Sequence, residues 1–157
     1  MYSGKRSWCC THCPPSERLH DDNCGELKAR LESATKKTRL MSRTRSRALK
    51  HGNWTVATRM AVEELEAWYF GDWQAVCLAY PRTSRSICNE AKYRRSDEIS
   101  GGTWEAFERV MRRAGYFEGG LRKIEAAREI AVHMDPSRNS SASFRSVRDV
   151  LKAMVSE

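Results

Sequence analysis

Apolar residues recur at intervals of three and four along most of this 157-residue chain, the spacing of one face of an α-helix. Turn and capping residues separate the periodic stretches, as Gly71-Asp72 and Asp135-Pro136 do. The pattern predicts helices over residues 24–35, 63–71, 73–80, 103–114, 121–134 and 144–154. The larger part of the chain is therefore expected to be helical.

One stretch has a different period. Residues 54–62 alternate large with small or polar side chains, are rich in β-branched residues and follow the turn signal Gly52-Asn53. This pattern predicts a strand. A single strand leaves its edges unpaired, so either further strands lie in residues 1–20 or the sheet is incomplete in this chain. We expect an α/β domain with a helix-rich C-terminal half.

The first twenty residues show neither period, and Pro14-Pro15 would break either element. We expect an irregular leader over 1–20, then one α/β domain over 21–157 with a basic loop at 36–53. Cysteines and a histidine gather near the leader: Cys9, Cys10, Cys13, His20 and Cys24. They could supply four ligands for zinc, but a second closely spaced pair is missing, which favours an incidental cluster.

Charge is distributed unevenly along the chain. The net charge is +8, and residues 1–53 hold 12 lysines and arginines against 5 acidic residues, whereas residues 54–157 hold 16 against 15. The excess in the first third suggests an anionic partner. No apolar run approaches membrane-spanning length and no secretory signal follows the N-terminus, so we expect a cytoplasmic location.

The basic stretch from Lys36 to Lys50 contains no acid. It is a candidate phosphate-contacting segment, with Arg43, Arg45, Arg47 and Lys50 as candidate nucleic-acid ligands and Arg122 as a further one. A solvated linker is the alternative. The linker is favoured because the run lacks interleaved aromatic residues on which bases could stack.

An acidic segment stands where the predicted strand ends and the next helix begins. Glu63 and Glu66 share a helical face, and Glu64 lies between them. Ligands bind at such junctions in open α/β sheets, and clustered carboxylates suit Mg²⁺ or Mn²⁺. The alternative is that these acids are ordinary first-turn residues of a helix.

Two further segments are weaker candidates. Gly119-Gly120 before Arg122 and Lys123 could hold a phosphate at a helix start, or could be a C-cap followed by a basic helix. The segment 133–143 has clear turn chemistry. No nucleophile with a recognisable signature accompanies His133, which favours a structural histidine.

Four stretches together resemble a bacterial family, domain-of-unknown-function family 4276. They are RMAVEELEAWYFGD over 59–72, GGTWEAFER over 101–109, GGLRKIEAAR over 119–128 and HMDPSRNSSASF over 133–144. The likeness runs from about Asp22 to the end. Members of that family look Toprim-like, with a parallel sheet flanked by helices that binds Mg²⁺ through acids at strand ends.

The resemblance implies a metal-dependent nuclease that works beside an AAA-type ATPase in phage defence. It makes Glu63, Glu64 and Glu66 the candidate catalytic acids and Lys123 a phosphate contact. Asp21 and Asp22 would join Glu64 as ligands of Mg²⁺ or Mn²⁺.

The sequence departs from the family pattern at its start. Arg18 and His20 stand where acids are expected, and the first strand is absent. We therefore expect a truncated copy, with residues 1–19 read from a shifted frame or a misplaced start, that holds half of an active site and is inactive. The alternative function is a non-catalytic basic module that binds nucleic acid or a partner protein.

Overall fold

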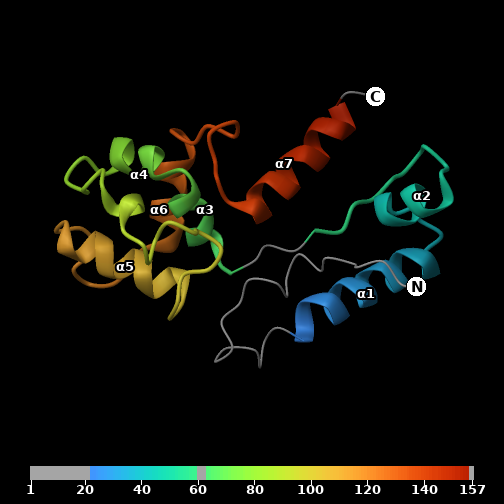
Figure 1. Cartoon of the computed structure of the whole chain (residues 1–157), viewed down its shortest axis with the longest axis horizontal. Coiled ribbons are helices and arrows are strands. Elements are labelled where there is room, and N and C mark those ends of the chain that lie inside the picture. Colours follow the sequence, from blue (N-terminus) through green and yellow to red (C-terminus); the bar gives the residue numbers. More distant parts are fainter. Residues whose placement is uncertain (1–21, 60–62, 156–157) are drawn as a thin grey trace. The chain divides into compact units, whose positions relative to one another are not determined.

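The structure is a computed structural model that describes residues 22–59 and 63–155. The chain divides into two compact units, Met1–Met60 and Ala61–Glu157, and each is considered by itself. The described residues form seven α-helices and one short 3-10 helix and contain no strand or sheet (Figure 1). The expected Toprim-like α/β fold is therefore wrong for the part of the chain that the structure describes.

The first unit contains α1 (Asp22–Lys37) and α2 (Arg43–Leu49). Ser42 caps α2, because its hydroxyl accepts a hydrogen bond from the Arg45 backbone N–H at 3.2 Å. Lys50 ends α2 in the left-handed conformation with φ 53°. The segment 43–49, which the sequence predicted as part of a basic loop, is thus helical.

The predicted strand over 54–62 is also wrong within the described residues. Over 54–59 only Val56 pairs, in an isolated parallel bridge with Ser42, and residues 60–62 lie outside the described residues. The backbone N–H of Arg43 donates to the Val56 carbonyl at 2.8 Å, and that of Thr55 donates to the Met41 carbonyl at 2.8 Å. The segment therefore satisfies part of its backbone against the start of α2 rather than in a sheet.

A partly buried carboxylate ties the first unit together. Glu32 of α1 accepts short hydrogen bonds from the hydroxyls of Ser42 and Thr58, both of which are buried. Burial works against its charge, but hydrogen bonds from Ser42, Thr58 and Thr44 lower the pKa of Glu32 below its ordinary value. One side chain thus links α1, the cap of α2 and the returning segment.

The second unit holds the remaining helices around a continuous aromatic core. They are α3 (Leu65–Gly71), α4 (Trp73–Ala79), the 3-10 helix (Ile87–Asn89), α5 (Thr103–Arg113), α6 (Lys123–Ala131) and α7 (Ala142–Val155). Phe70 lies at the centre, with its ring stacked at 5.3 Å on Trp73 and at 5.2 Å on Tyr93. The Phe107 ring of α5 meets Phe70 edge-on at 6.1 Å.

The apolar stripes of the sequence predicted most of this core. Phe107, Val110 and Met111 are buried as expected, whereas Ile124 of α6 is 71% exposed. Ile130, on the same helix, is fully buried. None of the helices within the described residues is both long and apolar enough to cross a membrane.

Candidate functional site

Two of the predicted acids and the predicted lysine meet in the second unit. The Lys123 Nζ atom lies 3.4 Å from Glu64 Oε1 and 3.9 Å from Glu66 Oε1. The same ammonium lies 4.7 Å from the centre of the Trp104 ring. We call Glu64, Glu66 and Lys123 the acid–lysine cluster. It joins residues 59 positions apart in the chain.

The start of α3 positions the two acids of this cluster. Glu64 is the residue before α3, and its backbone N–H donates to the Thr103 hydroxyl at 3.4 Å. Glu63, immediately before it, has φ 60°, a left-handed conformation that is uncommon for a residue with a side chain. Glu64 and Lys123 are about half exposed, whereas the Glu66 side chain is 3% exposed. The cluster therefore has an accessible side and a buried side.

Burial perturbs the buried acid. Desolvation raises the pKa of Glu66 above its ordinary value, Lys123 opposes that shift, and the charges of Glu64 and Glu105 add to it. Burial also raises the pKa of Tyr69, one turn further along α3, and the charge of Glu66 contributes. The Tyr69 hydroxyl is buried and has no hydrogen-bond partner. A buried acid with a shifted pKa beside a lysine is typical of functional sites.

The cluster does not by itself fit a divalent metal. Mg²⁺ and Mn²⁺ need several oxygen ligands, and no group of three or more His, Cys, Asp or Glu side chains that could hold a metal occurs in residues 22–59 and 63–155. The Lys123 ammonium is already the cation beside Glu64 and Glu66. Asp21 and the side chain of Asp22 lie outside the described residues, so the expected set of Glu64, Asp21 and Asp22 stays a prediction.

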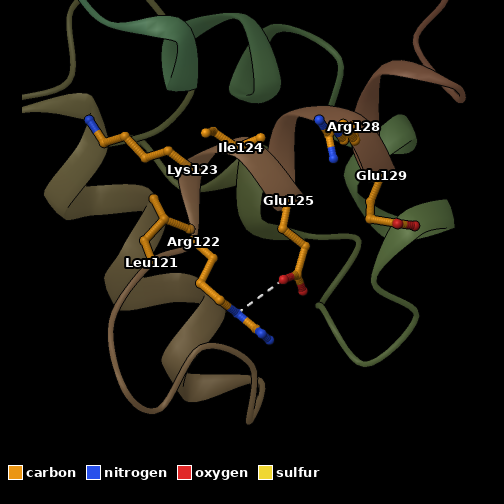
Figure 2. Close-up of a pocket in the computed structure, with 7 residues that line it drawn as sticks. All are labelled: Leu121, Arg122, Lys123, Ile124, Glu125, Arg128 and Glu129. Carbon is orange, nitrogen blue, oxygen red and sulfur yellow. Dashed lines mark ion pairs between the residues drawn. The ribbon is translucent and has the colours of Figure 1, made fainter.

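An open pocket of about 640 Å³ lies along the start of α6 (Figure 2). Its lining residues are consecutive or nearly so in the chain: Leu121, Arg122, Lys123, Ile124, Glu125, Arg128 and Glu129. Arg122 pairs with Glu125 at 3.1 Å, and Figure 2 shows that it extends in a different direction from Lys123. The structure thus places Arg122 in an ion pair of its own.

The glycine pair before α6 does not offer a set of open phosphate donors. The backbone N–H of Gly120 donates to the Phe117 carbonyl at 2.9 Å. That of Leu121 donates to a carboxylate oxygen of Glu108 at 3.1 Å. A carboxylate at this position would repel a phosphate, and the preceding helix α5 already ends at Arg113, so Gly119-Gly120 form neither a phosphate cradle nor a C-cap but part of a turn.

The basic side chains of the first unit converge more than the sequence suggested. Arg43 and Arg47 lie four positions apart in α2, on one face. Partial burial and the positive charges of Arg43 and Arg47 lower the pKa of Arg59. The Arg59 Nε atom is buried without a hydrogen-bond partner. We call Arg43, Arg47 and Arg59 the arginine cluster.

Two residues near the arginines, Trp54 and Arg59, could not be recognised from the sequence pattern. The sequence pattern gives Arg59 no role and includes position 54 only as the start of the predicted strand, but the structure puts the Arg43 guanidinium 5.4 Å from the centre of the Trp54 ring. The basic stretch 36–50, which was expected to lack an aromatic neighbour, therefore has one. It is Trp54, which belongs to the segment that turns back along α2. Arg45 and Lys50 are exposed on and beside α2.

The segment 133–144 is structural. Arg138 holds the fully buried Asp72 carboxylate through bonds of 2.6 and 3.0 Å, and the Asp135 backbone N–H donates to the same group at 2.8 Å. The Asn139 side-chain amide donates to the Trp68 carbonyl at 2.9 Å, and the Ser140 backbone N–H donates to the Gly71 carbonyl at 2.8 Å. This segment therefore fixes the end of α3, and with it the helix that begins at the acid–lysine cluster.

An acid from a third segment completes the brace. The Asp97 carboxylate accepts bonds from the Ser141 hydroxyl at 2.7 Å and from the Ala142 N–H at 2.6 Å. It thereby caps α7 from a distant position in the chain. The Trp68 indole N–H donates to the Ser143 hydroxyl at 2.9 Å, which fastens α3 to the start of α7.

These observations define a helical protein class with two separate candidate sites, an acid–lysine cluster at the start of α3 and an arginine cluster beside α2. The chain belongs to the family described as "Domain of unknown function (DUF4276)", whose model matches residues 16–154. That match spans both units and all four stretches on which the resemblance rests. No curated protein matches the chain. No solved structure matches it either.

Proposed function

We propose that this protein binds nucleic acid through the basic face of its first unit. The observation that carries the proposal is the arginine cluster: Arg43 and Arg47 share one face of α2, and Arg59 is partly buried within reach of their charges. Like charges held together are costly unless an anion relieves the repulsion. A chain of phosphates would supply that anion at regular spacing.

The charge of the described first unit supports this proposal. Residues 22–59 hold ten lysines and arginines and three acidic residues. Glu32, one of these three acids, is committed to hydrogen bonds with Ser42 and Thr58 inside the unit. Glu32 keeps its negative charge and favours the charged form of Arg59, but the ten basic residues outnumber the three acids, so the net charge around α2 is positive.

The test is the salt dependence of binding to a fluorescently labelled 20-nucleotide DNA, measured by anisotropy. We expect the full-length protein to bind with an affinity that falls steeply as salt rises. Replacing Arg43, Arg47 and Arg59 together by Gln should remove up to three phosphate contacts. The slope of log affinity against log salt should then fall by roughly two to three, since each contact contributes about 0.7 to 0.9.

A matched control separates the cluster from net charge. Arg109, Arg113 and Arg128 are exposed residues of the second unit, and their replacement by Gln removes the same charge. This control should keep most of the binding and its salt slope. Equal loss in the two triple variants, or binding that salt does not weaken, would contradict the proposal. Circular dichroism establishes that both variants are folded.

A metal-dependent nuclease is the second candidate function, and the acid–lysine cluster favours it. A buried acid with a raised pKa, an exposed acid and a lysine are side chains suited to proton transfer and to stabilising phosphate charge. A metal would need further ligands from outside the described residues. The AAA-type ATPase partner, the role in phage defence and the cytoplasmic location also stay predictions.

Cleavage assays with Mg²⁺ or Mn²⁺ test this second candidate. Loss of cleavage in Glu64→Gln, with cleavage retained in the control Glu118→Gln, would support it, since Glu118 is exposed. Metal-dependent cleavage that Glu64→Gln leaves intact would place the chemistry elsewhere. Binding without any cleavage would leave the first proposal as the function of this chain.

A further inference from the structure

We infer that the ligand of the arginine cluster is single-stranded nucleic acid, with Trp54 as the platform on which one base stacks. This inference rests on the proposed function and names its substrate class. It depends on an aromatic ring that lies beside Arg43, which a purely electrostatic duplex-binding surface would not need. Duplex binding is an outcome that the experiment below can show.

The backbone of the first unit brings the ring and the arginines together. The chain turns at Gly52, which has φ 85°, and runs back past the start of α2. The hydrogen bond from the Arg43 N–H to the Val56 carbonyl fixes this return. Trp54 and Arg59 therefore flank a short segment that is held against the helix carrying Arg43 and Arg47.

The side chains have the chemistry that a nucleotide requires. The Arg43 guanidinium lies 5.4 Å from the centre of the Trp54 ring, and Trp54 is only partly buried. A tryptophan beside an arginine can stack a base and contact the phosphate next to it. Arg59 is partly buried and adds a third guanidinium group to the same unit, so a neighbouring phosphate would meet positive charge from Arg59 as well as from Arg43 and Arg47.

A single strand fits this arrangement better than a duplex. The bases of a duplex are stacked on one another, so an aromatic platform reaches a base only if the strand is open. Stacking of a base on an aromatic side chain contributes about 1 to 3 kcal/mol per base and depends little on sequence. A strand without bases, which keeps the phosphates, should lose this contribution and retain the electrostatic one.

The experiment compares three ligands of equal length at one salt concentration: oligothymidylate, an abasic oligonucleotide and a DNA duplex. The full-length protein should bind oligothymidylate about 5- to 140-fold more tightly than the abasic strand. Trp54→Leu should reduce that preference to less than about twofold. Trp54→Tyr, which keeps an aromatic ring, should restore most of it.

The outcomes distinguish this inference from the proposed function. If wild-type protein binds oligothymidylate and the abasic strand equally, Trp54 stacks no base and the inference is overturned, although nucleic-acid binding stands. Tighter binding of the duplex than of oligothymidylate overturns it as well. If none of the three ligands binds, the proposed function fails too. The comparison of ligands on wild-type protein needs no variant, so it stands even if Trp54→Leu fails to fold.

Discussion

Replacing Gly71 by Ala should destabilise the second unit, although the same substitution inside a helix is ordinarily favourable. Gly71 is the last residue of α3, and the segment 133–144 packs directly on its backbone. A Cβ atom added at Gly71 would lie 2.3 Å from Asn139 Oδ1 and 2.9 Å from the Ser141 backbone nitrogen. Both distances are shorter than van der Waals contact, so the segment would have to move.

The size of the effect follows from what would move. Asn139 is 2% exposed; its side chain donates to the Trp68 carbonyl and accepts from the Ser141 N–H, both at 2.9 Å. Overpacking costs about 1 to 3 kcal/mol, and a buried polar group that loses its partner costs about 1 to 3 kcal/mol more. Against this, alanine gains at most about 1 kcal/mol in helix propensity. These terms give a net loss of about 1 to 6 kcal/mol.

Urea denaturation followed by tryptophan fluorescence and circular dichroism measures this loss. Gly25→Ala is the matched control, because Gly25 lies in α1 and an added Cβ would meet no atom within 4 Å. That variant should be unchanged or slightly more stable. Gly71→Ala with Asn139→Ala should lose less stability than the two single losses added together, since one clash disappears. Stability of Gly71→Ala equal to wild type would refute the close packing.

Two further predictions concern single carboxylates. Asp97→Ala should lose about 1 to 3 kcal/mol and speed hydrogen exchange at the start of α7, because Asp97 accepts bonds from the Ala142 and Ser143 N–H groups; unchanged exchange there would contradict the capping role. Burial raises the folded-state pKa of Glu66 above 4.5, because the buried site favours the protonated carboxyl. The resulting contribution to the free energy of unfolding is fully present below pH 4.5 and is lost as pH rises through the folded-state pKa. Glu66→Gln should therefore gain stability relative to wild type as pH rises above 4.5. A difference between the two proteins that does not change as pH rises, measured by denaturation curves, would count against the buried acid.

Local patterns predicted the helices well, for physical reasons. Helix signals act within a few residues, so they can be recognised in the sequence. Examples are the apolar spacing of Leu27 and Leu31 and the helix-ending residues Gly71 and Pro81. The predicted helix over 24–35 is contained in α1, and the helix predicted from Thr103 begins there as α5. Their boundaries differ by a few residues because capping depends on the surrounding structure.

The predicted strand is wrong because an alternating pattern of side chains does not supply the neighbouring strand with which a backbone must pair. Residues 54–59 have the composition of a strand, but the described residues offer Val56 one bridge, with Ser42. The expected Toprim-like sheet came from the resemblance together with this stretch. The family assignment holds for residues 16–154, whereas the fold that was inferred with it does not.

The sequence by itself determined the helices other than α2 and the short 3-10 helix, the excess of basic charge in the first third and the family. Only the tertiary structure decided which distant residues meet. Lys123 reaches Glu64 and Glu66 across 59 and 57 positions, and Arg138 reaches Asp72 across 66. Trp54 and Arg59 join the arginines of α2 because the chain turns at Gly52. Periodicity reports each helix face separately, whereas contacts between faces depend on how the helices and loops pack.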